Sequence, residues 1–294
     1  MPAQRNPIKI QNQIQHLVDY IETHLDEVLS LEMLANEIGY SPFHLHHIFR
    51  AYTNETLGGY IRRRRLANAL HWLTHSDRRI IEIALICGYQ SSASFSKGFR
   101  QIYGITPSEV RKSFRIPVSI STIQIRPNRQ RSYPMENEIR EIPDQLVLAV
   151  ERKGLTQKNF NKAADEAFLI LTRFIRLNGY GSHVGACLGI TPDENVDTPS
   201  QNARYIAGYF LKGDPKIELR GEVNKLTLPG GRYAVFVHKG PYEVLWKTWD
   251  QIYHDWFPES GFTLRDAMPY EVYVRNKQEF PPQELITEIY IPIQ

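Results

Sequence analysis

Apolar residues recur at intervals of three and four along the first 115 positions of the chain and alternate with polar residues over much of the remainder. One helical face is outlined early by five apolar residues: Ile14, Leu17, Val18, Ile21 and Leu25. Because a helix returns to the same face about every 3.6 residues, this spacing predicts an amphipathic helix. The pattern repeats near residues 31–38 and 80–87, so the first 115 residues are predicted to be helical.

Beyond Ile116 the pattern changes. Residues 116–132 mix proline with basic side chains, which is typical of a linker. Two stretches with helical spacing follow, at about 162–177 and 242–256. Five segments around them alternate and are predicted strands: 145–151, 204–210, 232–238, 270–275 and 285–291.

Both halves repeat themselves, which indicates duplicated units. In the first half, Ala35, Gly39 and Tyr40 return as Ala84, Gly88 and Tyr89. In the second, residues 149–154 return as 235–240, each followed by a helical stretch. We therefore predict an all-α domain with two helix-turn-helix units at 1–115, a linker at 116–132, and an α+β domain of two β-α-β-β units at 133–294.

Composition and charge narrow the classes of function. The two cysteines, Cys87 and Cys187, form neither a disulfide framework nor a metal-binding CxxC pair, and no apolar run marks an exported or membrane protein. We expect a cytoplasmic protein. The net charge is +3, and the first 115 residues hold 14 Lys and Arg against 10 Asp and Glu. This excess of positive charge indicates the first 115 residues as the part that would bind a polyanionic partner.

The first repeated unit has the features of a helix-turn-helix. A small Ala allows close helix crossing, Gly39 suits a left-handed turn, Ser41 caps the next helix, and Pro42 occupies its first position. In this helix, at about 42–52, Leu45, Ile48 and Phe49 form the predicted buried stripe, with His44 at its edge. The outer face is predicted to carry Phe43, His46, His47 and Arg50.

The second unit places a helix at about 92–103, capped by Ser91 or Ser92 and buried through Phe95 and Phe99. Hydroxyls and a cation on an exposed helix suit a DNA groove, since both groups bond to phosphates and base edges. A solvated helix is the alternative, and the duplication favours DNA. The outer face is predicted to carry Ser92, Ala93, Ser96, Lys97 and Arg100.

Residues 80–113 closely resemble the AraC/XylS family of transcription regulators, and the resemblance spans about residues 8–115. It rests on Ile83-Ala84, Gly88-Tyr89, Phe95, Phe99, Gly104, Thr106-Pro107-Ser108 and Arg111. It implies two helix-turn-helix subdomains joined by a linker helix at 57–73, with two recognition helices in successive major grooves of double-stranded DNA. It also implies an activator that works with RNA polymerase.

The same resemblance implies base or backbone contacts by Phe43, His46 and His47 in the first recognition helix, and by Ser92, Ala93, Ser94 and Lys97 in the second. Family members often carry Trp, Gln and Arg at the first three positions. Because an imidazole cannot make the two-pronged contact of Arg to guanine, a different operator is expected.

Other uses of these polar residues are less well supported. A metal site is not favoured, since no HExxH motif occurs and the nearest carboxylates, Glu37 and Glu55, belong to other predicted elements; no catalytic residue or cofactor is predicted either. Arg62 to Arg65 form the strongest charge run. Because successive helical residues point about 100° apart, we expect one or two to contact phosphate or to pair with acidic residues between subdomains.

The strand at 270–275 carries a candidate ligand site. Alternation places Tyr270, Val272 and Val274 on one face and Glu271 and Tyr273 on the other. If the valines pack under the helices, Glu271 faces the open concave side. A carboxylate among aromatic rings suits a lipophilic cation or an amphipathic amine. An internal ion pair with Arg275, among aromatics that only form core, is the alternative.

Residues 133–294 are also similar to the gyrase-inhibitor-like effector domain of multidrug-sensing regulators, in which a Glu at the position of Glu271 contacts the ligand. The candidate ligand-binding residues are Glu271, Tyr273, Tyr205, Tyr209, Trp246 and Trp249. The glycine-rich run 179–185 is predicted to be a turn, since it lacks the flanking strand and helix of a dinucleotide site.

We therefore expect a sequence-specific DNA-binding regulator, cytoplasmic and nucleoid-associated, whose second domain binds a small effector or a protein partner. The alternative is a hydrolase in the second domain that uses Glu271 with Tyr242 or Tyr273. Architectural binding at a replication origin would use the same DNA-contacting face.

Overall fold

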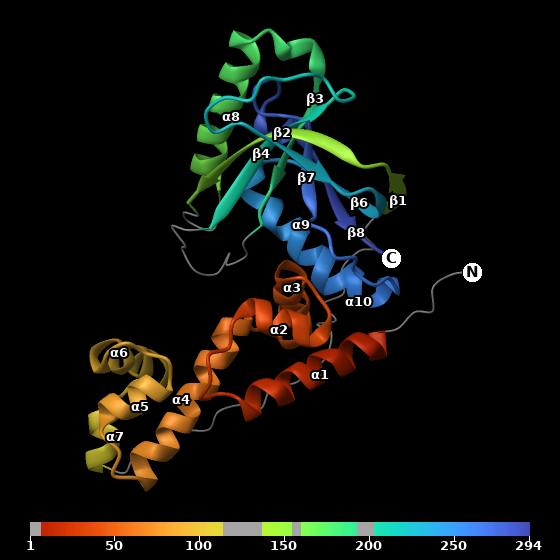
Figure 1. Cartoon of the computed structure of the whole chain (residues 1–294). Helices are drawn as coiled ribbons and strands as arrows, with labels where there is room; N and C mark the ends of the chain where they lie inside the picture. The colour runs from red at the N-terminus through yellow and green to blue at the C-terminus, as the bar shows by residue number, and fades with distance from the viewer. Residues whose placement is uncertain (1–6, 114–136, 155–159, 193–202) are drawn as a thin grey trace. The chain divides into compact units, whose positions relative to one another are not determined.

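The structure, a computed structural model, describes residues 7–113, 137–154, 160–192 and 203–294 (Figure 1). The chain divides into two compact units, built mostly from the helices that end at Ser113 and from the strands and helices that begin at Asn137. The predicted linker, 116–132, lies outside the described residues.

The described part of the first unit is helical, as predicted. Its helices are α1 (Pro7–Thr23), α2 (Leu31–Ile38), α3 (Pro42–Thr53), α4 (Leu57–His75), α5 (Ile80–Ile86), α6 (Ser92–Tyr103) and α7 (Pro107–Ser113). Helices α3 and α6 coincide with the two predicted recognition helices, and α4 with the predicted linker helix.

The two helix-turn-helix turns have the expected backbone. Gly39 follows α2 with a φ of 72°, and Gly88 follows α5 with a φ of 79°. Both values lie in the left-handed region, which costs glycine little because it has no Cβ. The next helix is capped in each case: the Ser41 hydroxyl accepts from the His44 amide at 3.4 Å, and the Ser91 hydroxyl from the Ser94 amide at 3.1 Å.

The predicted buried stripes of α3 and α6 are confirmed, but the predicted outer face of α3 is not exposed throughout, since Phe43 and His46 are buried. Leu45, Ile48 and Phe49 are fully buried in α3, as are Phe95 and Phe99 in α6. The second subdomain has a cluster of its own, to which the C-terminal half of α4 contributes. Its buried members are Leu66, Ala69, Leu73, Ile83, Ala84, Cys87, Phe95, Phe99 and Val110.

The second unit is one eight-stranded antiparallel sheet with its helices on one face. The strands are β1 (Asn137–Ile142), β2 (Gln145–Lys153), β3 (Val184–Ile190), β4 (Arg204–Leu211), β5 (Asn224–Leu228), β6 (Gly231–Lys239), β7 (Tyr270–Arg275) and β8 (Ile286–Pro292). Helix α8 (Asn161–Leu177) lies between β2 and β3. Between β6 and β7 a mixed helical segment runs from Tyr242 to Ser260 and contains α9 (Leu245–Gln251) and α10 (Phe257–Ser260).

The strand order is β1-β6-β8-β7-β3-β4-β2-β5, which reads the same from either edge when β1 to β4 are matched with β5 to β8. The predicted duplication is therefore confirmed, and its unit is larger than predicted because a preceding strand, β1 or β5, belongs to each copy. Strands β7 and β3 meet at the centre, where Glu271 pairs with Gly189 and Val272 with Leu188.

The two faces of the sheet bury different residues. One face packs on α8 through Leu148, Val150 and Tyr205. Val272 belongs to the cluster on the opposite face, with Leu188. The expectation that the valines lie under the helices, leaving Glu271 on the open side, is therefore wrong: Glu271 and Tyr273 share the face that carries the helices, and Val274 is exposed.

Candidate functional site

The outer face of α6 is arranged as the sequence predicts. Phe95 and Phe99 hold the helix against its subdomain. The remaining positions form a largely polar surface, on which the cations Lys97 and Arg100 lie three residues apart on one side of the helix. Ala93, Ser94, Lys97 and Arg100 are exposed, and Ser92 and Ser96 are half-buried. This face presents hydroxyl groups and positive charge together.

Ser94 also has a structural role. Its hydroxyl donates to the Ser91 carbonyl at 2.9 Å while its amide donates to the Ser91 hydroxyl. The first turn of α6 is thereby capped by the Ser91 and Ser94 side chains. Ser91, not Ser92, is the cap.

In α3, Phe43, His46, His47 and Arg50 lie at the spacing of one helical face. The rings of Phe43 and His47 have centroids 4.9 Å apart, and those of His46 and His47 are 6.0 Å apart. The chain thus gathers three aromatic rings on the first two turns of the helix. Their contacts with bases remain predictions.

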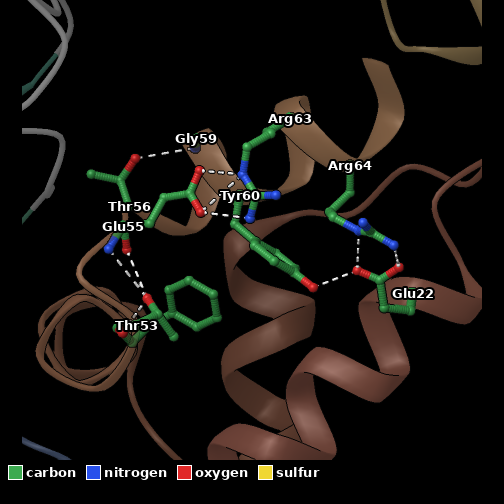
Figure 2. A network of polar contacts seen from close by, with 9 residues as sticks. Glu22, Thr53, Glu55, Thr56, Gly59, Tyr60, Arg63 and Arg64 are labelled. Carbon is green, nitrogen blue, oxygen red and sulfur yellow. Dashed lines mark hydrogen bonds and ion pairs between the residues drawn. The ribbon is translucent and has the colours of Figure 1, made fainter. Parts of the chain in front are cut away.

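The four consecutive arginines of α4, Arg62 to Arg65, make different contacts. Arg63 pairs with Glu55 and Arg64 with Glu22 (Figure 2). Arg65 donates to the Leu25 carbonyl at 2.8 Å. The expectation that one or two of these arginines pair with acidic residues is confirmed, for Arg63 and Arg64. Arg62 is exposed.

Two further observations concern the family motif and the whole described chain. Arg111, the arginine of the family motif, donates to the Arg78 carbonyl at 2.6 Å, so it secures the segment between α4 and α5. Across the described ranges of the whole chain, no three His, Cys, Asp or Glu side chains come together as a metal site would require, and no helix has the length and apolar character needed to cross a membrane.

The candidate ligand site of the second unit is built around Glu271 of β7. One carboxylate oxygen accepts from the indole N–H of Trp249 on α9 at 2.7 Å, and the other accepts from the Tyr273 hydroxyl at 2.7 Å. The Tyr205 hydroxyl of β4 lies 2.8 Å from that of Tyr273. Because Tyr273 gives its proton to Glu271, Tyr205 is the donor to Tyr273, and the three groups form a directed chain.

A glycine makes room for this chain. Gly189 of β3 lies opposite Glu271, and a Cβ added there would lie 2.3 Å from the Tyr273 hydroxyl and 2.4 Å from the Tyr205 hydroxyl. Both distances are far below van der Waals contact, so any larger residue would displace the tyrosines. Glycine is therefore required at position 189, opposite Glu271.

Aromatic rings surround the carboxylate and its tyrosines. Tyr242 lies 5.3 Å from Tyr273 between ring centroids, and Phe168 of α8 lies 6.1 Å from Tyr273. Tyr209 contacts Phe168 at 6.0 Å and so lies one ring further from the carboxylate. Trp246, by contrast, is 48% exposed with the Lys247 ammonium over its ring. Of the six predicted residues, four form the hydrogen-bonded group around Glu271, namely Glu271, Tyr273, Tyr205 and Trp249.

Among the described residues, no cationic side chain bonds to Glu271, and its pKa reflects this. Burial raises its pKa above the ordinary value, and the bonds from Tyr273 and Trp249 oppose that rise without cancelling it. Arg275 lies over the Phe280 ring, so the predicted alternative of a Glu271–Arg275 pair is not formed. Burial and the nearby carboxylate likewise raise the pKa of Tyr273 and of Tyr205. Among the described residues, the groups bonded to Glu271 are neutral.

Sequence reasoning missed Phe168 and Gly189 at this site. Phe168 lies within the helical stretch of α8, where an aromatic residue is expected to belong to the core. Gly189 lies in β3, a strand that alternation did not reveal. Tyr242 was singled out only as a partner in hydrolysis, yet its position at the last turn before α9 makes it a wall of the site.

Comparison with known families agrees with this division. Residues 34–113 match a family described as a helix-turn-helix domain, and residues 135–294 match the GyrI-like small molecule binding domain. The right origin-binding protein of Escherichia coli K12 is 37% identical over 304 aligned residues, which cover 96% of this chain and 98% of that protein. The chain belongs to the AraC/XylS family of regulators. Its AraC/XylS domain is followed by a GyrI-like domain, as the sequence predicted.

Further relatives of this AraC/XylS protein match the first unit. The regulatory protein SoxS of Salmonella typhimurium is 42% identical over 101 residues, covering 34% of this chain and 94% of SoxS. A transcriptional regulator of the AraC type from Chromobacterium violaceum has a crystal structure with 30% sequence identity, covering 35% of this chain and 91% of that one, at a TM-score of 0.33. By its family and its two matched domains, the chain is a DNA-binding transcriptional regulator with a small-molecule-binding domain.

The raised pKa of Glu271 predicts a pH-dependent cost to stability. A carboxyl whose pKa is higher in the folded than in the unfolded state contributes nothing below the ordinary value of 4.5, and it destabilises the fold as pH rises through the folded pKa. Glu271→Gln removes this cost. The free energy of unfolding of the variant, minus that of the wild type, should therefore increase between about pH 4 and pH 8, measured by urea unfolding.

The matched control is Glu141→Gln, the same exchange at an exposed position of β1. Parallel pH curves for Glu271→Gln and the wild type would contradict the assignment of a buried, unpaired carboxylate.

Proposed function

We propose that this regulator reads two successive major grooves of double-stranded DNA with α3 and α6, and that its GyrI-like domain responds to a small lipophilic cation. The observation that supports the DNA part is the pair of helix-turn-helix units with the same left-handed glycine turn, one of which presents an exposed face of hydroxyls and cations. The observation that supports the effector part is the carboxylate bonded only to neutral groups among the described residues.

On α6, Lys97 and Arg100 neutralise phosphates, and Ser92, Ala93, Ser94 and Ser96 face the base edges and the sugar-phosphate backbone. On α3, the rings of Phe43, His46 and His47 and the cation of Arg50 take the corresponding places. Arg62, the exposed member of the α4 run, contacts phosphate as well. Binding of this kind places the protein on the nucleoid.

Activation of transcription follows if DNA-bound protein recruits RNA polymerase, which the family resemblance implies. Architectural binding at an origin needs the same DNA contacts and differs in where the sites lie. The hydrolase alternative has no support from the relatives named above, all of which are regulators or DNA-binding proteins.

The effector site favours a cation over a neutral ligand. Glu271 is partly removed from water, and no described residue of opposite charge bonds to it, so a ligand cation relieves an electrostatic cost that a neutral ligand leaves in place. The rings of Tyr273, Tyr242 and Phe168 add cation–π and apolar contacts. Trp249 links the site to α9, and Tyr209 extends it along α8.

The DNA proposal predicts a specific change in salt dependence. Lys97→Ala should weaken binding to a duplex selected by the wild-type protein, and it should reduce the slope of log K against log salt by about 1, because one phosphate contact is lost. Fluorescence anisotropy over a range of potassium chloride concentrations measures both. Lys216→Ala, which removes an exposed lysine of the second unit, should change neither. Equal slopes for Lys97→Ala and the wild type would show that Lys97 does not contact phosphate.

The effector proposal is tested with two probes of the same shape. Benzyltrimethylammonium is a cation, and neopentylbenzene replaces its nitrogen by carbon. Calorimetric titration should show tighter binding of the cation, and Glu271→Gln should weaken that binding about tenfold or more because a charge-assisted contact is lost. Glu141→Gln should leave it unchanged. Equal affinity of wild type and Glu271→Gln for the cation would remove Glu271 from the site.

A further inference from the structure

Helix α4 joins the two helix-turn-helix subdomains, and its first turns bond to the first subdomain through consecutive arginines. Figure 2 shows Arg64 facing the Glu22 carboxylate of α1, with the Tyr60 hydroxyl directed at the same carboxylate. The contact joins residues 42 positions apart in the sequence. It is therefore a tertiary contact between α1 and α4, not a local one.

The Glu22–Arg64 contact has the geometry of a strong ion pair. Arg64 donates from Nε to one oxygen of Glu22 and from Nη2 to the other, both at 2.6 Å. The side chains are 27% and 30% exposed, so the pair is partly shielded from water. Burial raises the pKa of Glu22, but the bonds from Arg64 and Tyr60 outweigh it and hold that pKa below the ordinary value. A two-pronged pair fixes orientation as well as distance.

Arg63 makes a similar pair within a short segment. Its guanidinium donates to both oxygens of Glu55, at 3.0 and 2.9 Å, across eight residues of sequence. Glu55 lies in the turn that leads directly into α4. This pair secures the start of α4 and does not reach another helix of the bundle.

Arg65 lies where the two subdomains meet. Its side chain donates to the carbonyls of Leu25 and Glu27, just beyond α1, at 2.8 and 2.5 Å. Its own carbonyl accepts from the Cys87 thiol at 3.3 Å, and a Cβ added at Gly88 would lie 2.5 Å from its guanidinium. The helix-turn-helix turn of the second subdomain therefore lies directly against an arginine that is bonded to the first.

The remaining turns of α4 belong to the second subdomain, because Leu66, Ala69 and Leu73 are buried in its cluster. The helix has 19 residues and is about 28 Å long, which approaches the pitch of about 34 Å that separates successive major grooves. A rotation of α4 about its contacts with α1 would carry the second subdomain, and α6 with it, along or away from the DNA.

We propose that Glu22 is a positioning residue for DNA recognition: by holding Arg64 in a two-pronged pair, it fixes α4 against α1 and so sets the spacing between the two half-sites that the recognition helices accept. The proposal rests on the proposed function, since it requires both helices to contact DNA. Glu22 itself touches no DNA in this account.

The consequence is a change in discrimination between spacings. With α4 held firmly, the second recognition helix is presented at one distance and one angle, and its effective concentration is high only at the matching half-site. With α4 loosened, that concentration falls at the matching half-site and rises at displaced ones. One inserted base pair displaces a half-site by about 3.4 Å and rotates it by about 34°.

The experiment uses the full chain and a two-part DNA site selected by the wild-type protein from random sequence. Affinities are measured for that site and for versions with one or two base pairs inserted between the half-sites. The measured quantity is the ratio of Kd for the inserted site to Kd for the selected site. We expect a ratio of about ten or more for the wild type and a ratio at least about threefold smaller for Glu22→Gln.

Glu55→Gln is the matched control. It makes the same exchange and the same change of charge, and it also breaks a two-pronged pair with an arginine of α4, but that pair is local. Its ratio should stay close to that of the wild type. Arg64→Lys, which keeps the charge and loses the two-pronged geometry, should lower the ratio as Glu22→Gln does. This second variant keeps the question answerable if Glu22→Gln does not fold, which circular dichroism reports.

A ratio unchanged in folded Glu22→Gln or Arg64→Lys would overturn the proposal, and so would an equal reduction in Glu55→Gln. A loss of affinity that is the same for all spacings would also overturn it, because it would assign Glu22 to stability alone. Wild-type protein that selects no two-part site would instead refute the proposed function, and this inference with it.

Discussion

One helix must satisfy two hydrophobic cores and a set of ion pairs at once. Helix α4 buries Leu66 and Ala69 in the second subdomain. Arginines of its earlier turns bond to Glu22, to Glu55 and to the backbone carbonyls just beyond α1. Arginine suits these contacts because its planar guanidinium reaches two acceptors in fixed geometry, whereas lysine is a point charge. The arrangement explains three of the four consecutive arginines, Arg63 to Arg65, as structural residues, and Arg62 is exposed.

The second unit depends on a different constraint, the burial of a carboxylate beside neutral donors. Trp249 and Tyr273 orient both oxygens of Glu271, and Gly189 leaves room for the tyrosines. Hydrogen bonds from neutral groups reduce the cost of burial without neutralising the charge. The carboxylate is therefore held in one orientation by neutral donors, which suits the proposed binding of a cation. The two-fold repetition of the sheet supplies the scaffold, while the carboxylate occurs in one copy, since Gly189, the cross-strand partner of Glu271, stands at the equivalent position of the other copy.

The sequence predicted the parts of this structure that local chemistry determines. Gly39, Ser41 and Pro42 define a turn, a cap and a first helical position, so α3 was placed within a residue of its observed bounds. The five strands with alternating residues were found. Strands β1 and β5 lie at the sheet edges and have few apolar residues, and β3 is a nearly continuous apolar run, so alternation revealed none of the three.

Tertiary contacts were harder to predict. Alternation showed that Glu271 and Tyr273 share a face. It did not show which face carries the helices, because the pattern within one strand does not say what packs on either face of the sheet. The roles of Gly189 and Glu22 depend on partners on other strands and helices. Of the five residues predicted to accompany Glu271 in the ligand site, three form its hydrogen-bonded group, whereas Trp246 belongs to the exposed side of α9.

Selection of bound duplexes from a random-sequence pool tests the central claim most directly. Paired helix-turn-helix units on one rigid α4 predict two short preferred blocks whose centres lie about 10 to 10.5 base pairs apart, on one face of the DNA. A single block, blocks with variable separation, or no enrichment above the starting pool would contradict the account.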